Sequence, residues 1–86
     1  MPYIPEEARR RLNPHIALLA NQIETRGELN YAITRLIVSG PNAKDYTALE
    51  AAIGTLECVK LELYRRVVGP YEDIKRDVNG EVYNAI

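Results

Sequence analysis

Apolar residues recur along this chain at intervals of three and four, the spacing of an amphipathic α-helix. The clearest example runs from Thr47 to Val68 and meets Gly69-Pro70 at its end. Such a helix is about 33 Å long, whereas a compact chain of this size has a radius of gyration near 12 Å, so it should cross the whole domain. One face carries the predicted core seam, which consists of Leu49, Ala52, Ile53, Leu56, Val59, Leu63 and Val67.

Caps and prolines set the expected limits of the other helices. Pro5 suits the first turn of a helix, and Asn13-Pro14 predicts a cap followed by the first position of the next helix. Thr25–Glu28 and Thr47–Glu50 both fit the capping-box pattern. Gly69-Pro70 predicts a stop followed by a new start. The predicted helices cover residues 5–12, 14–24, 26–39, 47–68 and 70–78, and residues 80–86 form an extended C-terminal tail.

These elements predict a single all-α domain over residues 1–86. The expected architecture is a small helical bundle built on one long central helix, with the short helices around it.

The long helix also has a second, small-residue face opposite the core seam. Gly54 costs about 1 kcal/mol relative to Ala inside a helix, and close approach of another backbone would account for it. A tolerated glycine on a weakly solvated face is the alternative. If the face is covered, a second copy is the natural cover, so the sequence predicts a homo-oligomer. The predicted interface consists of Ala51, Gly54, Thr55, Cys58 and Leu61.

Composition says more about the cellular compartment and the kinds of partner than about the function. The formal net charge is -1, which lacks the basic excess typical of proteins that bind duplex nucleic acid. The single cysteine excludes an internal disulfide and favours a reducing compartment. The N-terminus lacks the apolar region of a signal peptide, and no apolar run is long enough for a membrane span. We expect a cytoplasmic protein without a membrane partner.

No constellation of residues indicates catalysis. His15 is the only histidine and lacks companions for a metal site, and Cys58 lies among apolar neighbours, where a thiol behaves as a small hydrophobe. Glu57 and Glu62 are five residues apart and therefore point in different directions from a helix. Glu62 is better placed for an i, i+4 ion pair with Arg66. We therefore predict no catalytic residues, no metal site and no cofactor.

A cluster of tyrosine and basic residues is the candidate ligand site. Lys60 falls inside the core seam, where it either extends its ammonium past the helix edge or faces a pocket that receives an anion. Tyrosine faces stack on bases and arginine binds phosphate in a bidentate manner. The candidate ligand-binding residues are Tyr31, Arg35, Lys60, Tyr64 and Arg65.

Three strings of the sequence, together with the opening MPYI, resemble a small family of uncharacterised proteins found in bacterial and phage genomes. The strings are LNYAITRLI over 29–37, LECVKLELYRRVVGPYED over 56–73 and NGEVY over 79–83. The resemblance covers most of the chain. It implies a compact helical protein in a phage or bacterial setting, and it brings no activity or site residues.

Three functions follow as hypotheses. The first is a non-enzymatic homo-oligomer that sequesters a small anionic ligand, such as a signalling nucleotide, at subunit boundaries. The second is a protein-interaction module that acts as an adaptor or inhibitor of a host or phage protein. The third, an enzyme, is disfavoured by the lack of a catalytic constellation.

Overall fold

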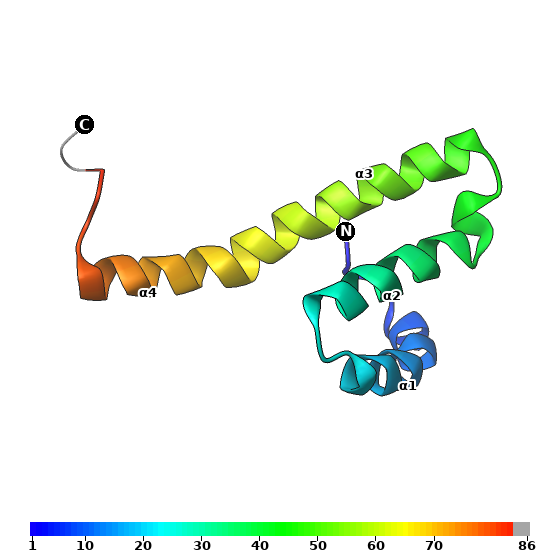
Figure 1. Ribbon diagram of the computed structural model, residues 1–86, viewed down its shortest axis with the longest axis horizontal. Helices are drawn as coiled ribbons and strands as arrows, with labels where there is room; N and C mark the ends of the chain where they lie inside the picture. The colour runs from blue at the N-terminus through cyan, green and yellow to red at the C-terminus, as the bar shows by residue number, and fades with distance from the viewer. Residues whose placement is uncertain (84–86) are drawn as a thin grey trace.

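The computed structural model describes residues 1–83, and every regular element within them is a helix (Figure 1). The all-α prediction is therefore confirmed. The helices are α1 (Glu6–Gln22), α2 (Arg26–Val38), the short 3-10 turn η1 (Pro41–Ala43), α3 (Tyr46–Leu63), the π-turn η2 (Tyr64–Val68) and α4 (Gly69–Asn79).

The predicted break at Asn13-Pro14 is wrong, because α1 runs through Pro14 without interruption. A proline inside a helix removes one hydrogen bond and crowds one carbonyl. Here the helix continues on both sides, with surface ion pairs in its first turns. The N-cap of α1 is Pro5 rather than a residue with a capping side chain.

The capping box at the start of α2 is confirmed. The hydroxyl of Thr25 accepts a hydrogen bond from the Glu28 amide at 3.1 Å. The Glu28 carboxylate accepts one from the Glu24 amide at 2.7 Å, one residue before the expected donor. Two backbone amides at this helix start are thus satisfied.

The capping box predicted at Thr47 is wrong. Asp45 caps α3, and its carboxylate accepts a hydrogen bond from the Ala48 amide at 2.8 Å. An aspartate at this position both accepts the bond and complements the positive end of the helix dipole. The helix therefore begins at Tyr46, one residue before Thr47.

The predicted stop at Gly69-Pro70 is also wrong, because α3, η2 and α4 form one continuous helix of 34 residues. We call Tyr46–Asn79 the long helix. In a regular α-helix, Pro70 would crowd the carbonyl of Arg66. The π-turn relieves this crowding: the Gly69 amide donates to the Tyr64 carbonyl five residues earlier. A Cβ on Gly69 would lie 3.2 Å from that carbonyl oxygen, so glycine fits here.

The π-turn also keeps the apolar residues on one side of the long helix. Val59, Leu63, Val67 and Tyr71 are each four residues apart. At 100° per residue, each such step drifts about 40° around an α-helix. A π-turn contains an extra residue and takes up this drift. We call the resulting line the apolar stripe: Leu49, Ala52, Leu56, Val59, Leu63, Val67, Tyr71, Ile74 and Val78.

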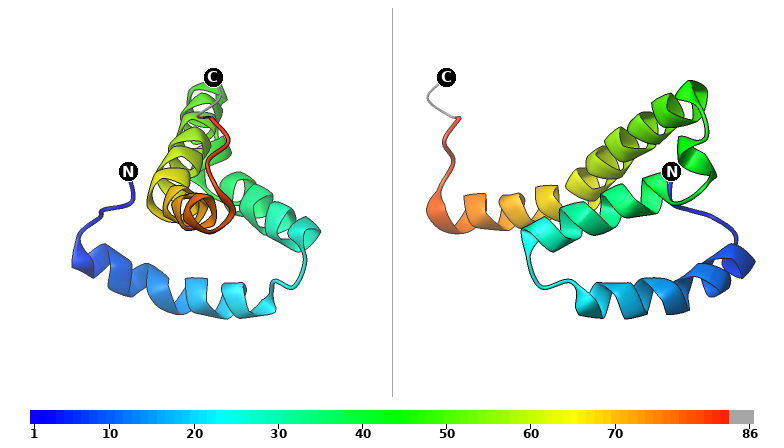
Figure 2. Two further views of the ribbon diagram at one scale, coloured as in Figure 1. Left: turned by 90° about the vertical axis from the view of Figure 1, so that its left-hand side faces the viewer. Right: turned by 45° about the vertical axis from the view of Figure 1, so that its right-hand side comes forward.

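The helices are arranged openly around the long helix. Figures 1 and 2 show α2 and α3 joined at η1 as the two arms of a V, with α1 below α2 and α4 pointing away from the other helices. The radius of gyration is 17.1 Å, compared with about 12 Å for a compact chain of this length. Ala52 is the one buried residue among residues 1–83, with 7% of its surface exposed.

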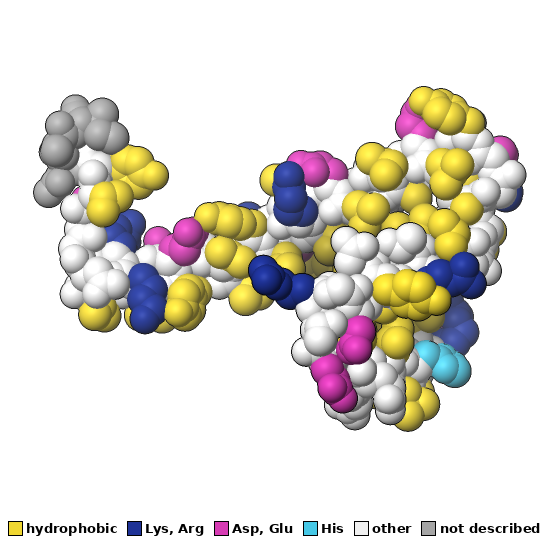
Figure 3. Space-filling view, in the orientation of Figure 1, with side chains coloured by type: hydrophobic (Ala, Val, Ile, Leu, Met, Phe, Trp, Pro, Cys, Tyr) yellow, Lys and Arg dark blue, Asp and Glu magenta, His cyan; other side chains and the backbone are white. Residues whose placement is uncertain are grey.

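Hydrophobic side chains consequently lie at the surface along the length of the molecule (Figure 3). The segment after α4 begins at Gly80, whose φ of 102° ends the helix where the sequence predicts it. Of the predicted tail, residues 80–83 contain no helix or strand, and residues 84–86 lie outside the described residues.

Candidate subunit interface and ligand-binding surfaces

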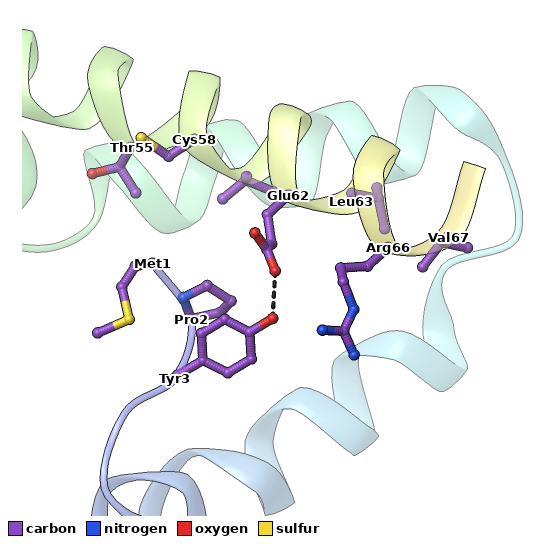
Figure 4. Close-up of a pocket in the computed structure, with 10 residues that line it drawn as sticks. Met1, Pro2, Tyr3, Thr55, Cys58, Glu62, Leu63, Arg66 and Val67 are labelled. Atoms are coloured by element: carbon purple, nitrogen blue, oxygen red, sulfur yellow. Dashed lines mark hydrogen bonds between the residues drawn. The ribbon is translucent and has the colours of Figure 1, made fainter. Parts of the chain in front are cut away.

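A hollow lies where the N-terminal segment passes beside the long helix (Figure 4). Its volume is about 510 Å³. The N-terminal segment supplies one wall, and successive turns of α3 and η2 supply the other. The lining residues are Met1, Pro2, Tyr3, Thr55, Cys58, Val59, Glu62, Leu63, Arg66 and Val67. Most of this surface is apolar, so the hollow suits hydrophobic side chains with a charge at the edge.

A hydrogen bond fastens the N-terminal segment at this site. The Tyr3 hydroxyl donates to the carboxylate of Glu62, 59 residues later in the chain. The Arg65 guanidinium donates to both oxygens of the same carboxylate, at 2.9 and 3.0 Å. Glu62 thus pairs with Arg65. The predicted ion pair between Glu62 and Arg66 is wrong. A single guanidinium nitrogen of Arg65, Nη2, reaches both oxygens of the carboxylate.

These contacts shift the protonation equilibria in opposite directions. The hydrogen bond from Tyr3, followed by those from Arg65, holds the pKa of Glu62 below its ordinary value. The same hydrogen bond raises the pKa of Tyr3, since only the protonated hydroxyl can donate. The bonds to Glu62 likewise raise the pKa of Arg65. At neutral pH, Glu62 is therefore ionised and Tyr3 is protonated, so the hydrogen bond between them is present.

Arg66 is the basic residue at the edge of this hollow. Its side chain reaches down beside Tyr3 in Figure 4 and lines the hollow with Leu63 and Val67. It forms no ion pair with a carboxylate within residues 1–83. Arg66 can therefore receive an anionic group from outside the subunit.

A second hollow, of about 340 Å³, lies between α1 and α2. Tyr31 and Arg35 both line it, together with apolar atoms of Leu19 and Leu36. Arg35 also forms no ion pair with a described carboxylate. These two members of the predicted ligand set share one surface.

The other three members lie on the long helix, away from that hollow, and each has a partner. Lys60 Nζ lies 3.1 Å from a Glu57 carboxylate oxygen on an exposed surface. Tyr64 donates a hydrogen bond to Glu72, which raises the pKa of Tyr64. Arg65 binds Glu62 as described. A single subunit therefore does not bring the five predicted ligand residues together.

The predicted small-residue face is split between a hollow and open surface. Thr55 and Cys58 line the N-terminal hollow, and the Thr55 hydroxyl donates to the Ala51 carbonyl at 3.0 Å. A Cβ added to Gly54 would meet no atom within 4 Å, and Leu61 is 58% exposed. The backbone at Gly54 is open to an approaching partner.

Sequence reasoning missed Tyr3 and Arg66. Tyr3 contacts a residue 59 positions away, a pairing for which no local pattern exists. Sequence spacing predicts that Arg66 pairs with Glu62. In the structure, the Glu62 carboxylate binds Arg65 instead. Their position beside the apolar hollow becomes visible only in three dimensions.

The model of one protein family, described as a domain of unknown function (DUF6899), matches residues 1–82. The chain belongs to the DUF6899 family. The match confirms an uncharacterised family over nearly the whole DUF6899 chain. No curated protein and no solved structure matches the sequence.

Two further observations limit the chemistry of the described part of this DUF6899 member. Within residues 1–83, no three histidine, cysteine, aspartate or glutamate side chains converge as a metal site would require. In the same residues, no helix has both the length and the apolar character needed to cross a lipid bilayer.

Proposed function

We propose that this chain is a non-enzymatic helical subunit of a homo-oligomer that binds a small anionic ligand at its subunit boundaries. The observation that carries the proposal is the size of the exposed surface. The chain exposes 7834 Å², whereas a folded monomer of its mass exposes about 5,100 Å².

The excess of about 2,700 Å² per chain is of the size that obligate subunits bury. Such interfaces cover about 2,000–5,000 Å² in total, or roughly half that on each partner. The exposed residues include Leu61, Leu63 and Ile74 along the long helix. Burial of apolar surface supplies about 25 cal/mol per Å², so association would stabilise an open subunit strongly. Assembly would also complete the bundle that a single chain leaves open.

The ligand part of the proposal concerns Arg35 and Arg66, which form no ion pair within residues 1–83. Arg35 lies with Tyr31 on one hollow, and Arg66 lies at the edge of another. Guanidinium groups bind phosphate in a bidentate manner, and tyrosine faces stack on bases. A nucleotide that carries both groups fits this chemistry, and contact between subunits could bring Lys60, Tyr64 and Arg65 close to Arg35.

The small-residue face is a proposed contact surface in the same assembly. Ala51, Gly54, Thr55, Cys58 and Leu61 present small or apolar side chains, so another helix could approach closely. A phage or bacterial origin and a cytoplasmic location belong to this proposal as well, and rest on the sequence alone.

Light scattering and calorimetry test the two parts separately. The expected mass is a multiple of 9.7 kDa, and titration with cyclic dinucleotides or mononucleotides should release heat that Arg35→Gln abolishes. Arg9→Gln is the matched control, because Arg9 is exposed on α1 and lines neither hollow. A monomeric mass at high concentration contradicts the whole proposal. An oligomer that gives no heat with any nucleotide contradicts the ligand part.

An interaction module is the second candidate, favoured by the outer surface of α2. Tyr31, Leu36 and Val38 are all exposed there beside Arg35, and aromatic residues with arginine are enriched at interface centres. Under this alternative, a stoichiometric protein partner recovered by pull-down should be lost with Tyr31→Ala and kept with Tyr46→Ala. Loss with both variants, or with neither, contradicts it.

A further inference from the structure

We infer that the exposed part of the apolar stripe, from Val59 to Val78, binds the same part of a second copy of the chain. The two helices lie antiparallel. This inference rests on the proposed homo-oligomer and adds the contact surface, the orientation and the register.

The surroundings of the apolar stripe differ between the two halves of the long helix. Ala52 and Leu56 share a small hollow with Ile33 and Ile37 of α2, so the first half faces another helix. Beyond η2, α4 contacts no other helix among the described residues, and it points away from them in Figure 2. Ile74 and Val78 are 62% and 73% exposed. Within residues 1–83, the N-terminal segment borders Val59 to Val67 across a hollow, and no helix covers Ile74 and Val78.

Residues 80–83 do not supply the missing cover. They approach the opposite side of α4, where Val82 and Tyr83 share a hollow with Glu72 and Arg76. Tyr71, Ile74 and Val78 do not line that hollow. Most of the stability of a helix in a protein comes from packing of its amphipathic face, and α4, the last part of the long helix, lacks such packing on this face. The uncovered face of α4 therefore needs a partner.

Charge along the long helix selects an antiparallel partner. Residues 60–66 contain Lys60, Arg65 and Arg66 against the single acid Glu62, a net charge of +2. Residues 72–81 contain four acids against two bases, a net charge of −2. A parallel pair would place each block beside its own copy, with like charges together. An antiparallel pair places the basic block of one copy beside the acidic block of the other.

The spacing of the stripe fixes the register of the pair. An antiparallel match centred between Val68 and Gly69 sets Leu63 opposite Ile74 and Val59 opposite Val78, with Val67 within one residue of the position opposite Tyr71. Each pair joins two exposed apolar side chains. The interface is isologous, as expected of a two-fold dimer.

The N-terminal hollow lies at the place this register requires. Val59, Leu63 and Val67 form its wall on the long helix, and Met1 and Tyr3 form the facing wall. The α4 helix of the second copy would enter between them with Tyr71, Ile74 and Val78. Its acidic block would then meet Arg66 at the edge, where no described carboxylate of the same chain pairs with it.

Disulfide trapping tests this pairing on the full chain. In a Cys58→Ser background, one sample carries Leu63→Cys and the other carries Ile74→Cys with an added affinity tag. Disulfides need Cα atoms within about 7 Å. Mild oxidation of the mixture should therefore give a mixed 63–74 dimer as the main crosslinked product, at least tenfold above either variant alone. Arg9→Cys, on the exposed side of α1, is the control and should crosslink with neither.

The outcomes separate this inference from the proposed function. A 63–63 dimer means a parallel pair and overturns the inference. An oligomeric mass by light scattering without any 63–74 product also overturns it, while the homo-oligomer stands. A monomeric mass refutes both. Both substituted side chains are exposed in the subunit, and helical content measured by circular dichroism verifies that each variant is folded.

Discussion

The two halves of the long helix carry the same apolar stripe and differ in what covers it. In the first half, Ala52 is 7% exposed because α2 lies against it. In the second half, Ile74 is 62% exposed because no other helix of the described chain reaches α4. The two halves continue one line of side chains, since the π-turn keeps them aligned. The difference therefore lies in the surroundings and not in the sequence pattern.

This contrast assigns separate roles to the halves. The covered half stabilises the fold of the single chain, and under the proposed homo-oligomer the open half stabilises the assembly. Substitutions in the first half should therefore change the free energy of unfolding of the subunit. Substitutions in the second half should change the mass of the protein in solution. The four predictions below test that division in order of decreasing effect.

The largest effect is expected from Ala52→Asp. It places an unpaired carboxylate between α2 and α3, and a charge left without a partner in such a place costs about 3 kcal/mol or more. Urea unfolding followed by circular dichroism measures the loss. Ala17→Asp makes the same change at an exposed position of α1 and should cost less than about 1 kcal/mol. Equal losses in the two variants would show that α2 does not shield the first half.

Ile74→Asp should leave the subunit helical and weaken association. Each copy loses an apolar side chain whose burial contributes about 1.5–3 kcal/mol. The dissociation constant should therefore rise at least tenfold, as measured by light scattering over a dilution series. Asn79→Asp adds the same charge to α4 away from the stripe and should have little effect. An unchanged dissociation constant for Ile74→Asp would place the interface elsewhere.

Gly69→Ala tests whether the π-turn aligns the halves. Alanine normally stabilises a helix interior by about 1 kcal/mol relative to glycine. Here the new Cβ would meet the Tyr64 carbonyl oxygen at 3.2 Å, so we expect a loss of about 1 kcal/mol in the free energy of unfolding. Gly27→Ala is the control, because its Cβ would meet only the Thr25 hydroxyl at 3.9 Å. A gain at Gly69 equal to that at Gly27 would mean that the turn has no such requirement.

The smallest effect is expected for the hydrogen bond between Tyr3 and Glu62, which holds the N-terminal segment beside the long helix. The folded pKa of Glu62 is lowered, so its contribution is present above the ordinary glutamate pKa and is lost as pH falls through the folded value. The folded pKa of Tyr3 is raised, so its contribution is present below the ordinary tyrosine pKa and is lost as pH rises through the folded value.

An NMR titration of the Tyr3 ring measures this coupling. Glu62→Gln should bring the pKa of Tyr3 down toward the ordinary value for tyrosine. Glu57→Gln, which removes a carboxylate that pairs with Lys60 instead, should leave the Tyr3 titration unchanged. A Tyr3 pKa that is the same in all three proteins would show that its hydroxyl does not bind Glu62 in solution.

Sequence patterns predicted most of the helices and failed where one local signal competed with another. The Thr25 capping box was correct because the Glu28 amide and carboxylate had no stronger competitor nearby. At Thr47, the carboxylate of Asp45 lay two residues earlier and took the capping role. Both failures at proline had another cause. Pro14 and Pro70 interrupt single hydrogen bonds, and the helices continue because the flanking turns are intact.

The candidate site was harder to predict than the fold. Helical periodicity places Val59 and Leu63 on one face without showing what lies opposite. The partner of that face within the subunit is the N-terminal segment, which precedes it by more than fifty residues. The ion pairs of Lys60 and Arg65 depend on side-chain conformations that spacing leaves open. Neighbouring positions on a helix can be predicted, whereas contacts between distant segments cannot.

The five-residue turn at Tyr64–Val68 contains one residue more than a regular helical turn. Deletion of one residue there would let the chain form a regular α-helix, and the residues that follow would keep their side of the helix because the turn exists to accommodate the extra residue. The apolar residues from Leu49 to Val78 would then recur at intervals of three and four throughout. Insertion of one further residue would instead rotate everything that follows by about 100°. Lengthening this turn should therefore be more damaging than shortening it.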